Sequence, residues 1–170
     1  MIHPNPLSIP RNPLHRGAGW LALCLMLAGC AGPQERTLAR LERIADAVMA
    51  APCDAPRYDY RLVDNAHVPG VTDQVEILRC PGLEARTYWS RESARPGGLP
   101  VFLLLTRPHP GLPAFLQPGS PGEGLERQLG RPTERHADYW RYGSVETTEA
   151  VTISWRDGRI RQLRWEWYLD

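Results

Sequence analysis

The stretch AVTISWRDGRIRQLRWEWYL, residues 150–169, decides the fold because it predicts an antiparallel β-hairpin. Apolar and polar residues alternate on both sides of Asp157-Gly158, a dipeptide typical of tight hairpin turns. In each strand, alternation places the apolar side chains on one face. These apolar residues are Val151, Ile153 and Trp155 before the turn, and Leu163, Trp165 and Trp167 after it.

The register of this hairpin predicts an irregularity. A regular two-residue turn pairs Ser154 with Arg161, which puts the two apolar sets on opposite faces of the sheet. A three-residue loop with Gly158 in the left-handed conformation, or a β-bulge after Ile160, brings them onto one face. We therefore predict one of these two irregularities. The polar residues of the outer face are then Thr152, Ser154, Arg156, Arg164 and Glu166.

Upstream of the hairpin, residues 35–51 have the apolar spacing of an amphipathic helix, and Pro52 prevents its continuation. Such a helix either covers a sheet or lies on a membrane surface, and we favour the sheet. Strand patterns follow, and a turn is expected at Pro81-Gly82. The expected strands are 58–63, 74–79, a strand through 87–89, and the apolar run 99–106.

A second, short helix is predicted after residue 120. The sequence SPGE at residues 120–123 has the pattern of a capping box, and Gly130 and Pro132 end the helix. The fold class is therefore α+β, an antiparallel sheet packed by one or two amphipathic helices. Helix, hairpin and tryptophan recur in that order, which suggests two degenerate helix–hairpin units within a single domain, residues 35–170. The units are residues 35–117 and 118–170.

The amino-terminal residues have the layout of a secretory signal: arginines without acids, a short uncharged apolar stretch, then small residues. The sequence LAGC, residues 27–30, resembles the lipobox of bacterial lipoproteins. This resemblance implies removal of residues 1–29, lipid on the sulfur of Cys30 with fatty acyl chains such as palmitate, and a linker at residues 30–34. Ala31 then implies the outer membrane. The alternatives are an ordinary cleaved signal or an uncleaved anchor, with Cys30 incidental.

Two further cysteines, Cys53 and Cys80, remain after the signal is excluded. In an oxidising compartment an isolated pair predicts a disulfide, which stabilises a loop of this size by about 3–4 kcal/mol. Two buried free thiols are the alternative. A metal site is disfavoured, because neither cysteine has ligands at the short spacing that zinc requires.

No catalytic residues are predicted. His67, His109 and His136 are isolated in polar or proline-rich stretches, where exposed loop positions are expected. The chain has no HExxH, GxSxG or phosphate-binding loop, and its carboxylates are scattered. The net charge of +1 implies no strong electrostatic partner. We therefore expect no metal and no cofactor besides the lipid on Cys30. An enzyme would need a deep pocket with converging histidine and carboxylate side chains.

The tryptophans and arginines of the hairpin allow two interpretations. The simpler one places the tryptophans inside and the arginines in solvent. The other is an exposed partner surface of Trp165, Trp167, Arg156 and Arg164, since both residue types are enriched where proteins bind each other. Nucleic acid is disfavoured as a partner by the compartment.

Residues 118–165 also have the order of a known unit: the capped helix and aromatic strand GSPGEGLERQLGRPTERHADYWRYG, then the hairpin VTISWRDGRIRQL. This order resembles the BamE (SmpA/OmlA) family of small outer-membrane lipoproteins. The resemblance implies helices on a three-stranded antiparallel sheet, and a non-catalytic role in supporting β-barrel insertion or binding envelope partners. Here, however, residues 31–117 separate the unit from the anchor.

The sequence therefore predicts a non-catalytic lipoprotein of the outer membrane, facing the periplasm, that binds envelope proteins or supports outer-membrane assembly. The alternative is an inhibitor or immunity protein against a cell-wall hydrolase. VEILRCPGLEARTYW, residues 75–89, resembles the strand-cysteine-strand pattern of lysozyme inhibitors.

Overall fold

The computed structural model describes residues 32–51, 53–65, 67–90, 98–143 and 149–168. The predicted signal, residues 1–29, and Cys30, the predicted site of lipid attachment, lie outside the described residues. The helices are α2 (Pro33–Ala50), the 3-10 helix η2 (Ala114–Leu116) and α3 (Leu125–Leu129). The strands are β1 (Arg57–Asp64), β2 (Thr72–Cys80), β3 (Leu83–Trp89), β4 (Leu99–Leu105), β5 (Glu134–Arg135), β6 (Tyr139–Gly143), β7 (Glu149–Arg156) and β8 (Arg159–Trp167).

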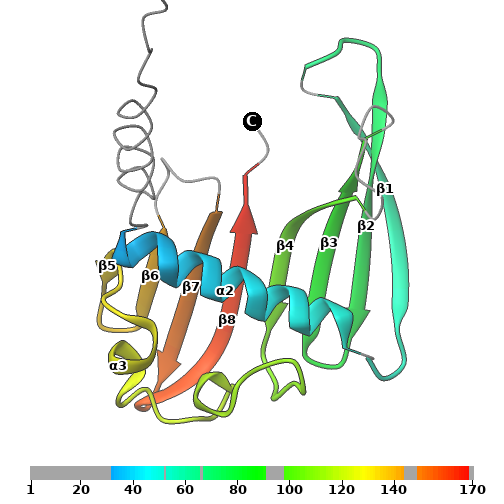
Figure 1. The fold of residues 1–170 in the computed structure, drawn as a ribbon. Helices are drawn as coiled ribbons and strands as arrows, with labels where there is room; N and C mark the ends of the chain where they lie inside the picture. Colours follow the sequence, from blue (N-terminus) through cyan, green and yellow to red (C-terminus); the bar gives the residue numbers. More distant parts are fainter. Residues whose placement is uncertain (1–31, 52, 66, 91–97, 144–148, 169–170) are drawn as a thin grey trace, which may run out of the picture. The chain divides into compact units, whose positions relative to one another are not determined.

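All eight strands form one antiparallel sheet in the order β1-β2-β3-β4-β8-β7-β6-β5 (Figure 1). The predicted α+β class is confirmed. The sheet consists of two four-stranded meanders, joined where β4 pairs with β8 from Phe102↔Glu166 to Leu105↔Leu163. A helix precedes each meander, so the same order of elements occurs twice. The predicted unit 118–170 contributes β5, β6, β7 and β8, which belong to the larger sheet.

The hairpin of β7 and β8 contains the predicted irregularity, and it is the bulge. Asp157 and Gly158 form a two-residue turn with positive φ values of 52° and 71°. Ser154 pairs with Gln162 and Trp155 with Ile160, so Arg161 is the extra residue of β8. The apolar residues of both strands consequently share one face. Val151, Ile153, Leu163 and Trp165 are at most 1% exposed.

Helix α2 crosses this apolar face (Figure 1). Its stripe of Leu38, Leu41, Ala45 and Val48 is buried in the core, so the helix covers the sheet as predicted. The Trp165 indole N–H donates to the Leu41 carbonyl oxygen at 3.1 Å, which fixes the helix on β8. The helix begins at Pro33, two residues earlier than predicted, and the Gly32 N–H donates to the Glu35 carboxylate at 2.7 Å. Pro33 and Gln34 of the expected linker 30–34 are therefore part of the helix.

The loop after β4 packs directly on the second half of α2. A Cβ atom at Gly111 would lie 2.6 Å from both the Ala47 carbonyl oxygen and the Val48 Cα atom, so only glycine fits this approach. The Gln117 side chain holds the loop in shape: its amide nitrogen donates to the His109 and Leu112 carbonyl oxygens at 3.0 and 2.7 Å. The loop therefore fixes the position of α2 along the sheet.

The capping box predicted at residues 120–123 is wrong. Helix α3 begins only at Leu125, after Gly124 in the left-handed conformation (φ 81°). The preceding residues instead pair with the hairpin: the Gly122 N–H donates to the Gly158 carbonyl oxygen at 3.0 Å, and the Ile160 N–H donates to that of Ser120 at 2.9 Å. The backbone groups of Ser120 and Gly122 therefore bond to the hairpin instead of to a first helical turn. This tertiary pairing prevents the helix from starting where the local sequence favours it.

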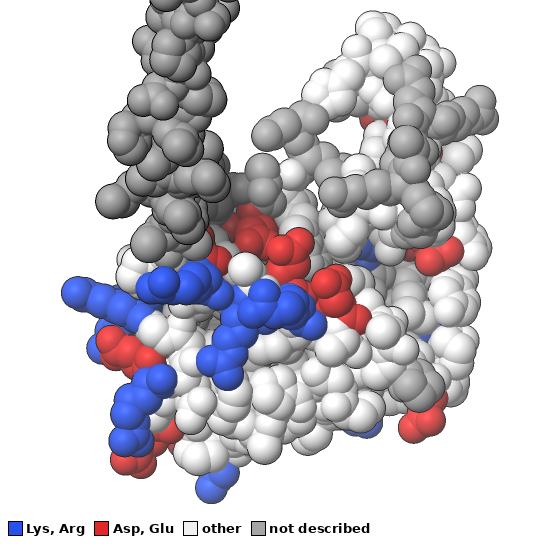
Figure 2. All heavy atoms as spheres, in the orientation of Figure 1, with Lys and Arg blue, Asp and Glu red and all other residues white. Residues whose placement is uncertain are grey.

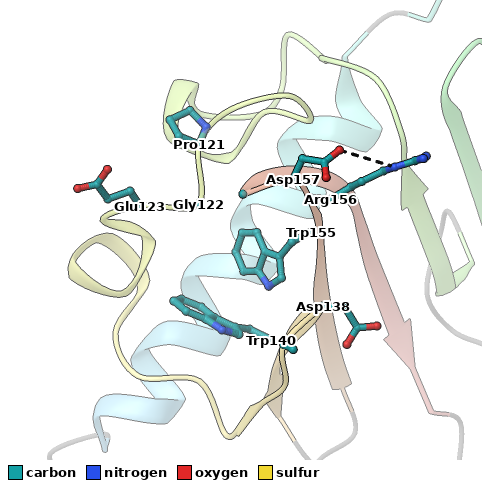
Figure 3. A pocket seen from close by; sticks show the side chains of 10 residues that line it. Pro121, Gly122, Glu123, Asp138, Trp140, Trp155, Arg156 and Asp157 are labelled. Carbon is teal, nitrogen blue, oxygen red and sulfur yellow. Dashed lines mark ion pairs between the residues drawn. The ribbon is translucent and has the colours of Figure 1, made fainter.

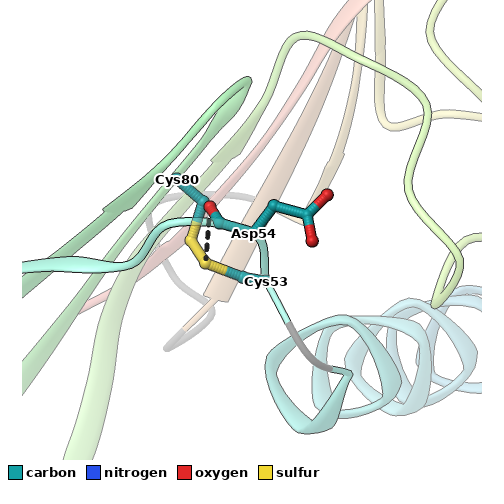
Figure 4. Close-up of a disulfide and its surroundings, with 3 residues drawn as sticks. All are labelled: Cys53, Asp54 and Cys80. Atoms are coloured by element: carbon teal, nitrogen blue, oxygen red, sulfur yellow. Dashed lines mark hydrogen bonds between the residues drawn. A yellow bond between two sulfur atoms is a disulfide. The ribbon is translucent and has the colours of Figure 1, made fainter.

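The predicted disulfide between Cys53 and Cys80 is present, with a Cα–Cα distance of 6.1 Å (Figure 4). It joins the segment after α2 to the last residue of β2. The carboxyl end of α2 and the hairpin of β1 and β2 are therefore linked covalently as well as by packing.

Candidate functional site

The four residues of the predicted partner surface do not form one surface. Trp165 is 1% exposed in the core and is not available to a partner. Trp167 is half-buried and packs against the core. Arg156 is exposed beside the β7–β8 turn. Arg164 lies on the sheet face opposite Trp165 and forms an ion pair with Glu166 at 3.3 Å. The simpler interpretation, with tryptophans inside and arginines outside, describes Trp165 and Arg156.

The histidines are separate from one another in the fold. His67 and His136 are exposed, as predicted, and the His136 ring stacks on Tyr139 with 4.3 Å between ring centroids. His109 differs from the prediction because it is half-buried, and burial lowers the pKa of its imidazole. Among the described residues, no group of three or more His, Cys, Asp and Glu side chains could hold a metal ion.

A cavity of about 690 Å³ lies beside the β7–β8 turn (Figure 3). Trp140 and Trp155 line it as an edge-to-face pair, with ring centroids 5.1 Å apart. Gly122 approaches the Trp155 ring so closely that a Cβ atom would lie 2.8 Å from it. The carboxylates of Glu123 and Asp138 point away from the two rings (Figure 3). These two carboxylates therefore do not converge on the space beside the rings.

The sheet face opposite α2 carries a row of alternating charges at its β1 end. Arg79 forms ion pairs with Asp59 and, at 3.2 Å, with Glu84, and Arg86 contacts Glu84 at 2.7 Å. Partial burial of Glu84 raises its pKa, but the hydrogen bonds and charges of Arg86 and Arg79 outweigh this, so the pKa lies below its ordinary value. Arg86 also stacks over the Phe102 ring at 4.6 Å. Asp59, Arg79, Glu84 and Arg86 therefore neutralise one another on this face.

The free edge of the sheet at β1 differs from the rest of the molecule. β1 is eight residues long and exposed along nearly its whole length. Three large apolar side chains on it are solvent-exposed: Tyr58 (52%), Tyr60 (58%) and Leu62 (77%). Figure 2 shows the helix-side surface over β1 and β2 as largely uncharged, whereas α2 carries many charges.

Edge strands in natural proteins are usually protected by proline, lysine, bulges or a covering segment. β1 has no proline, glycine or lysine, and it pairs with β2 in regular register from Arg57↔Arg79 to Asp64↔Thr72. At the other end of the sheet, β5 has only two residues. Among the described strands, β1 is therefore the long edge with backbone groups facing solvent.

The sequence did not reveal this edge. Tyr58, Tyr60 and Leu62 alternate with charged residues, as in any half-buried strand, so the pattern predicts a strand but not its neighbours. Only the sheet order shows that α2 and the core do not reach their side chains.

Among the described helices, none is long and apolar enough to span a membrane. A scan against protein-family models, a search of curated proteins and a search of solved structures found no match for the chain.

Proposed function

We propose that this protein is a non-catalytic lipoprotein, tethered to the outer membrane through Cys30, whose domain binds envelope proteins in the periplasm. The observation that supports this proposal best is the β1 edge, with its three exposed apolar side chains. An open edge of this kind binds an extended segment by strand addition, in which backbone hydrogen bonds supply affinity and side chains supply specificity.

The hydrogen-bonding pattern of β1 defines which residues face a partner. The Asn65 N–H donates to the Val71 carbonyl oxygen at 2.9 Å, which makes this a hydrogen-bonded pair between the two strands. Such pairs alternate along an antiparallel ladder, so the odd-numbered residues of β1 bond to β2. The even-numbered residues therefore direct their backbone N–H and C=O groups outward: Tyr58, Tyr60, Leu62 and Asp64.

The proposed tether holds the domain at the membrane surface, with β1 at the opposite end of the sheet from the start of α2. Helix α2 begins at Pro33, three positions after Cys30. Lipid with two or more acyl chains holds a protein stably on a bilayer without spanning it. Confinement to the membrane raises the effective concentration of partners attached to the same surface, so a binding edge of modest affinity is sufficient to hold them.

The anchor is tested by lipid incorporation and by amine chemistry. All 20 basic residues are arginine, so a chain that begins at an acylated Cys30 has no primary amine. We expect the protein purified from membranes to incorporate labelled palmitate and to resist an amine-reactive dye. The exposed substitution Arg36→Lys adds one amine and is expected to restore labelling. Cys30→Ser should abolish palmitate incorporation; a wild-type protein without palmitate would contradict the anchor.

Binding at the edge is tested by affinity capture from native membranes. Tyr60→Pro removes an outward N–H that β2 does not use, so it blocks strand addition while leaving the β1–β2 ladder intact. We expect the wild-type protein to capture envelope proteins, and the proline variant to capture an amount at least about tenfold lower. Tyr60→Phe, which keeps the N–H and the ring, is the matched control. Equal capture by the proline variant would show that binding does not use β1.

A further inference from the structure

We infer that the strand added to β1 is β1 of a second copy of this chain, paired antiparallel about a two-fold axis at Tyr60. This inference rests on the proposed function, because it names the partner of the same edge. Three features of the described residues support it: the hydrogen-bonding pattern, the charges, and the apolar row.

The hydrogen-bonding pattern limits the possible registers. Only the even-numbered residues of β1 direct backbone groups outward, so an antiparallel partner strand of the same sequence must pair even-numbered residues with each other. With the axis at Tyr60, Tyr60 lies opposite its own copy, and Tyr58 lies opposite Leu62. Each of these is a hydrogen-bonded pair of the kind that alternates along such ladders.

The charges select this register from its neighbours. With the axis at Tyr60, Asp59 of each copy lies opposite Arg61 of the other, which gives two pairs of opposite charge. Moving the axis to Asp59 or to Arg61 places like charges opposite each other, which is unfavourable. Asp59 is 62% exposed on its side chain despite its ion pair with Arg79, so it can also face a second arginine.

The apolar side chains become contiguous in the same arrangement. Tyr58 lies opposite Leu78 of β2, which packs against the core, so Tyr58, Tyr60 and Leu62 are on the α2 side of the sheet. A two-fold axis perpendicular to the sheet keeps this side the same in both copies. The two exposed rows therefore meet, and burial of their apolar surface favours the pair.

The assembly closes at two copies. An isologous two-fold contact uses the same surface on both partners and leaves it fully occupied. The opposite edge of the sheet is the two-residue strand β5, Glu134–Arg135, which is too short to continue the pairing. Copies tethered to one membrane also meet at a higher effective concentration than free chains do.

The test uses charge variants of the full-length protein, expressed as two differently tagged copies and purified from membranes in mild detergent. Asp59→Arg makes both cross-pairs arginine with arginine, and Arg61→Asp makes both aspartate with aspartate. We expect each variant, present in both tagged copies, to reduce co-purification by about tenfold or more. Mixing one copy of Asp59→Arg with one of Arg61→Asp restores both opposite-charge pairs, so co-purification is expected to recover.

The mixed pair separates this interface from damage within one chain, because Asp59→Arg also removes the ion pair with Arg79. Failure of the mixed pair to recover, or undiminished co-purification of either variant with itself, overturns the inference. The register has its own readout: Tyr60→Cys should form a disulfide between copies, because hydrogen-bonded pairs have suitable Cα separations, whereas Leu62→Cys should not.

The inference and the proposed function fail in different ways. If the wild-type protein captures another envelope protein, Tyr60→Pro loses it, and tagged copies do not co-purify, then the inference is wrong and the function of the edge stands. If neither a second copy nor another protein is captured through β1, both are wrong.

Discussion

Replacing Trp165 with alanine is expected to lower the free energy of unfolding by about 3–5 kcal/mol, the usual cost of truncating a large buried aromatic residue. Trp165 is among the largest fully buried side chains, at 1% exposure on the central strand β8. Its indole also bonds to the Leu41 carbonyl oxygen, so the substitution removes both core volume and a link between the sheet and α2. Urea unfolding followed by far-ultraviolet circular dichroism measures the loss.

Two further variants separate these contributions. Trp165→Phe keeps most of the apolar area but loses the N–H, so a loss of about 1–2 kcal/mol, plus a small cavity cost, is expected. Trp167→Ala removes a half-buried tryptophan two positions along the same strand and is expected to cost less than Trp165→Ala. Equal losses for the two alanine variants would show that Trp165 does not have the central position described here.

The second large effect is expected from the disulfide. Replacing both Cys53 and Cys80 with serine should lower the free energy of unfolding by about 3–4 kcal/mol, because the unfolded chain then gains the freedom that closing this loop removed. The sequence separation is 27 residues. The shift of the urea midpoint measures this loss. Reduction of the wild-type protein is the control and should give the same midpoint as the double variant, whereas a reductant should not change the variant.

No change of the midpoint would contradict this expectation. Typical domains are stable by only about 5–15 kcal/mol, so either substitution removes a large part of the total.

Local patterns predicted the elements of the fold well where burial and turn chemistry agree. An irregularity in the final hairpin could be predicted because a regular hairpin would put Trp165 on the face opposite Ile153. The sequence left open whether it is a longer loop or a bulge, and the structure shows the bulge at Arg161. The disulfide followed from the predicted oxidising compartment and from the presence of only two cysteines after the predicted signal and lipid attachment site. The hairpin prediction depends on residues that are close in sequence. The disulfide prediction depends on two cysteines that can pair only with each other.

The failures concern long-range contacts. The SPGE pattern at residues 120–123 satisfies a helix start, but Gly122 bonds to Gly158 in the hairpin, and the sequence does not reveal that neighbour. Likewise, Trp165 and Trp167 have equal hydrophobicity, and only the position of α2 decides which of them is buried. The β1 edge was missed for the same reason, because the order of strands in a sheet is not encoded in their alternation.

The junction of β4 and β8 has a consequence for how the chain is made. β4, with the sequence LPVFLLL, is one of the most apolar strands, and its second neighbour, β8, is the last strand in chain order. During amino-to-carboxyl synthesis, β4 can pair with β3 early but has an open apolar edge until β8 emerges, and such an edge favours aggregation. Closure of the β7–β8 hairpin over β4 therefore removes this apolar edge only after nearly all the described strands have been made.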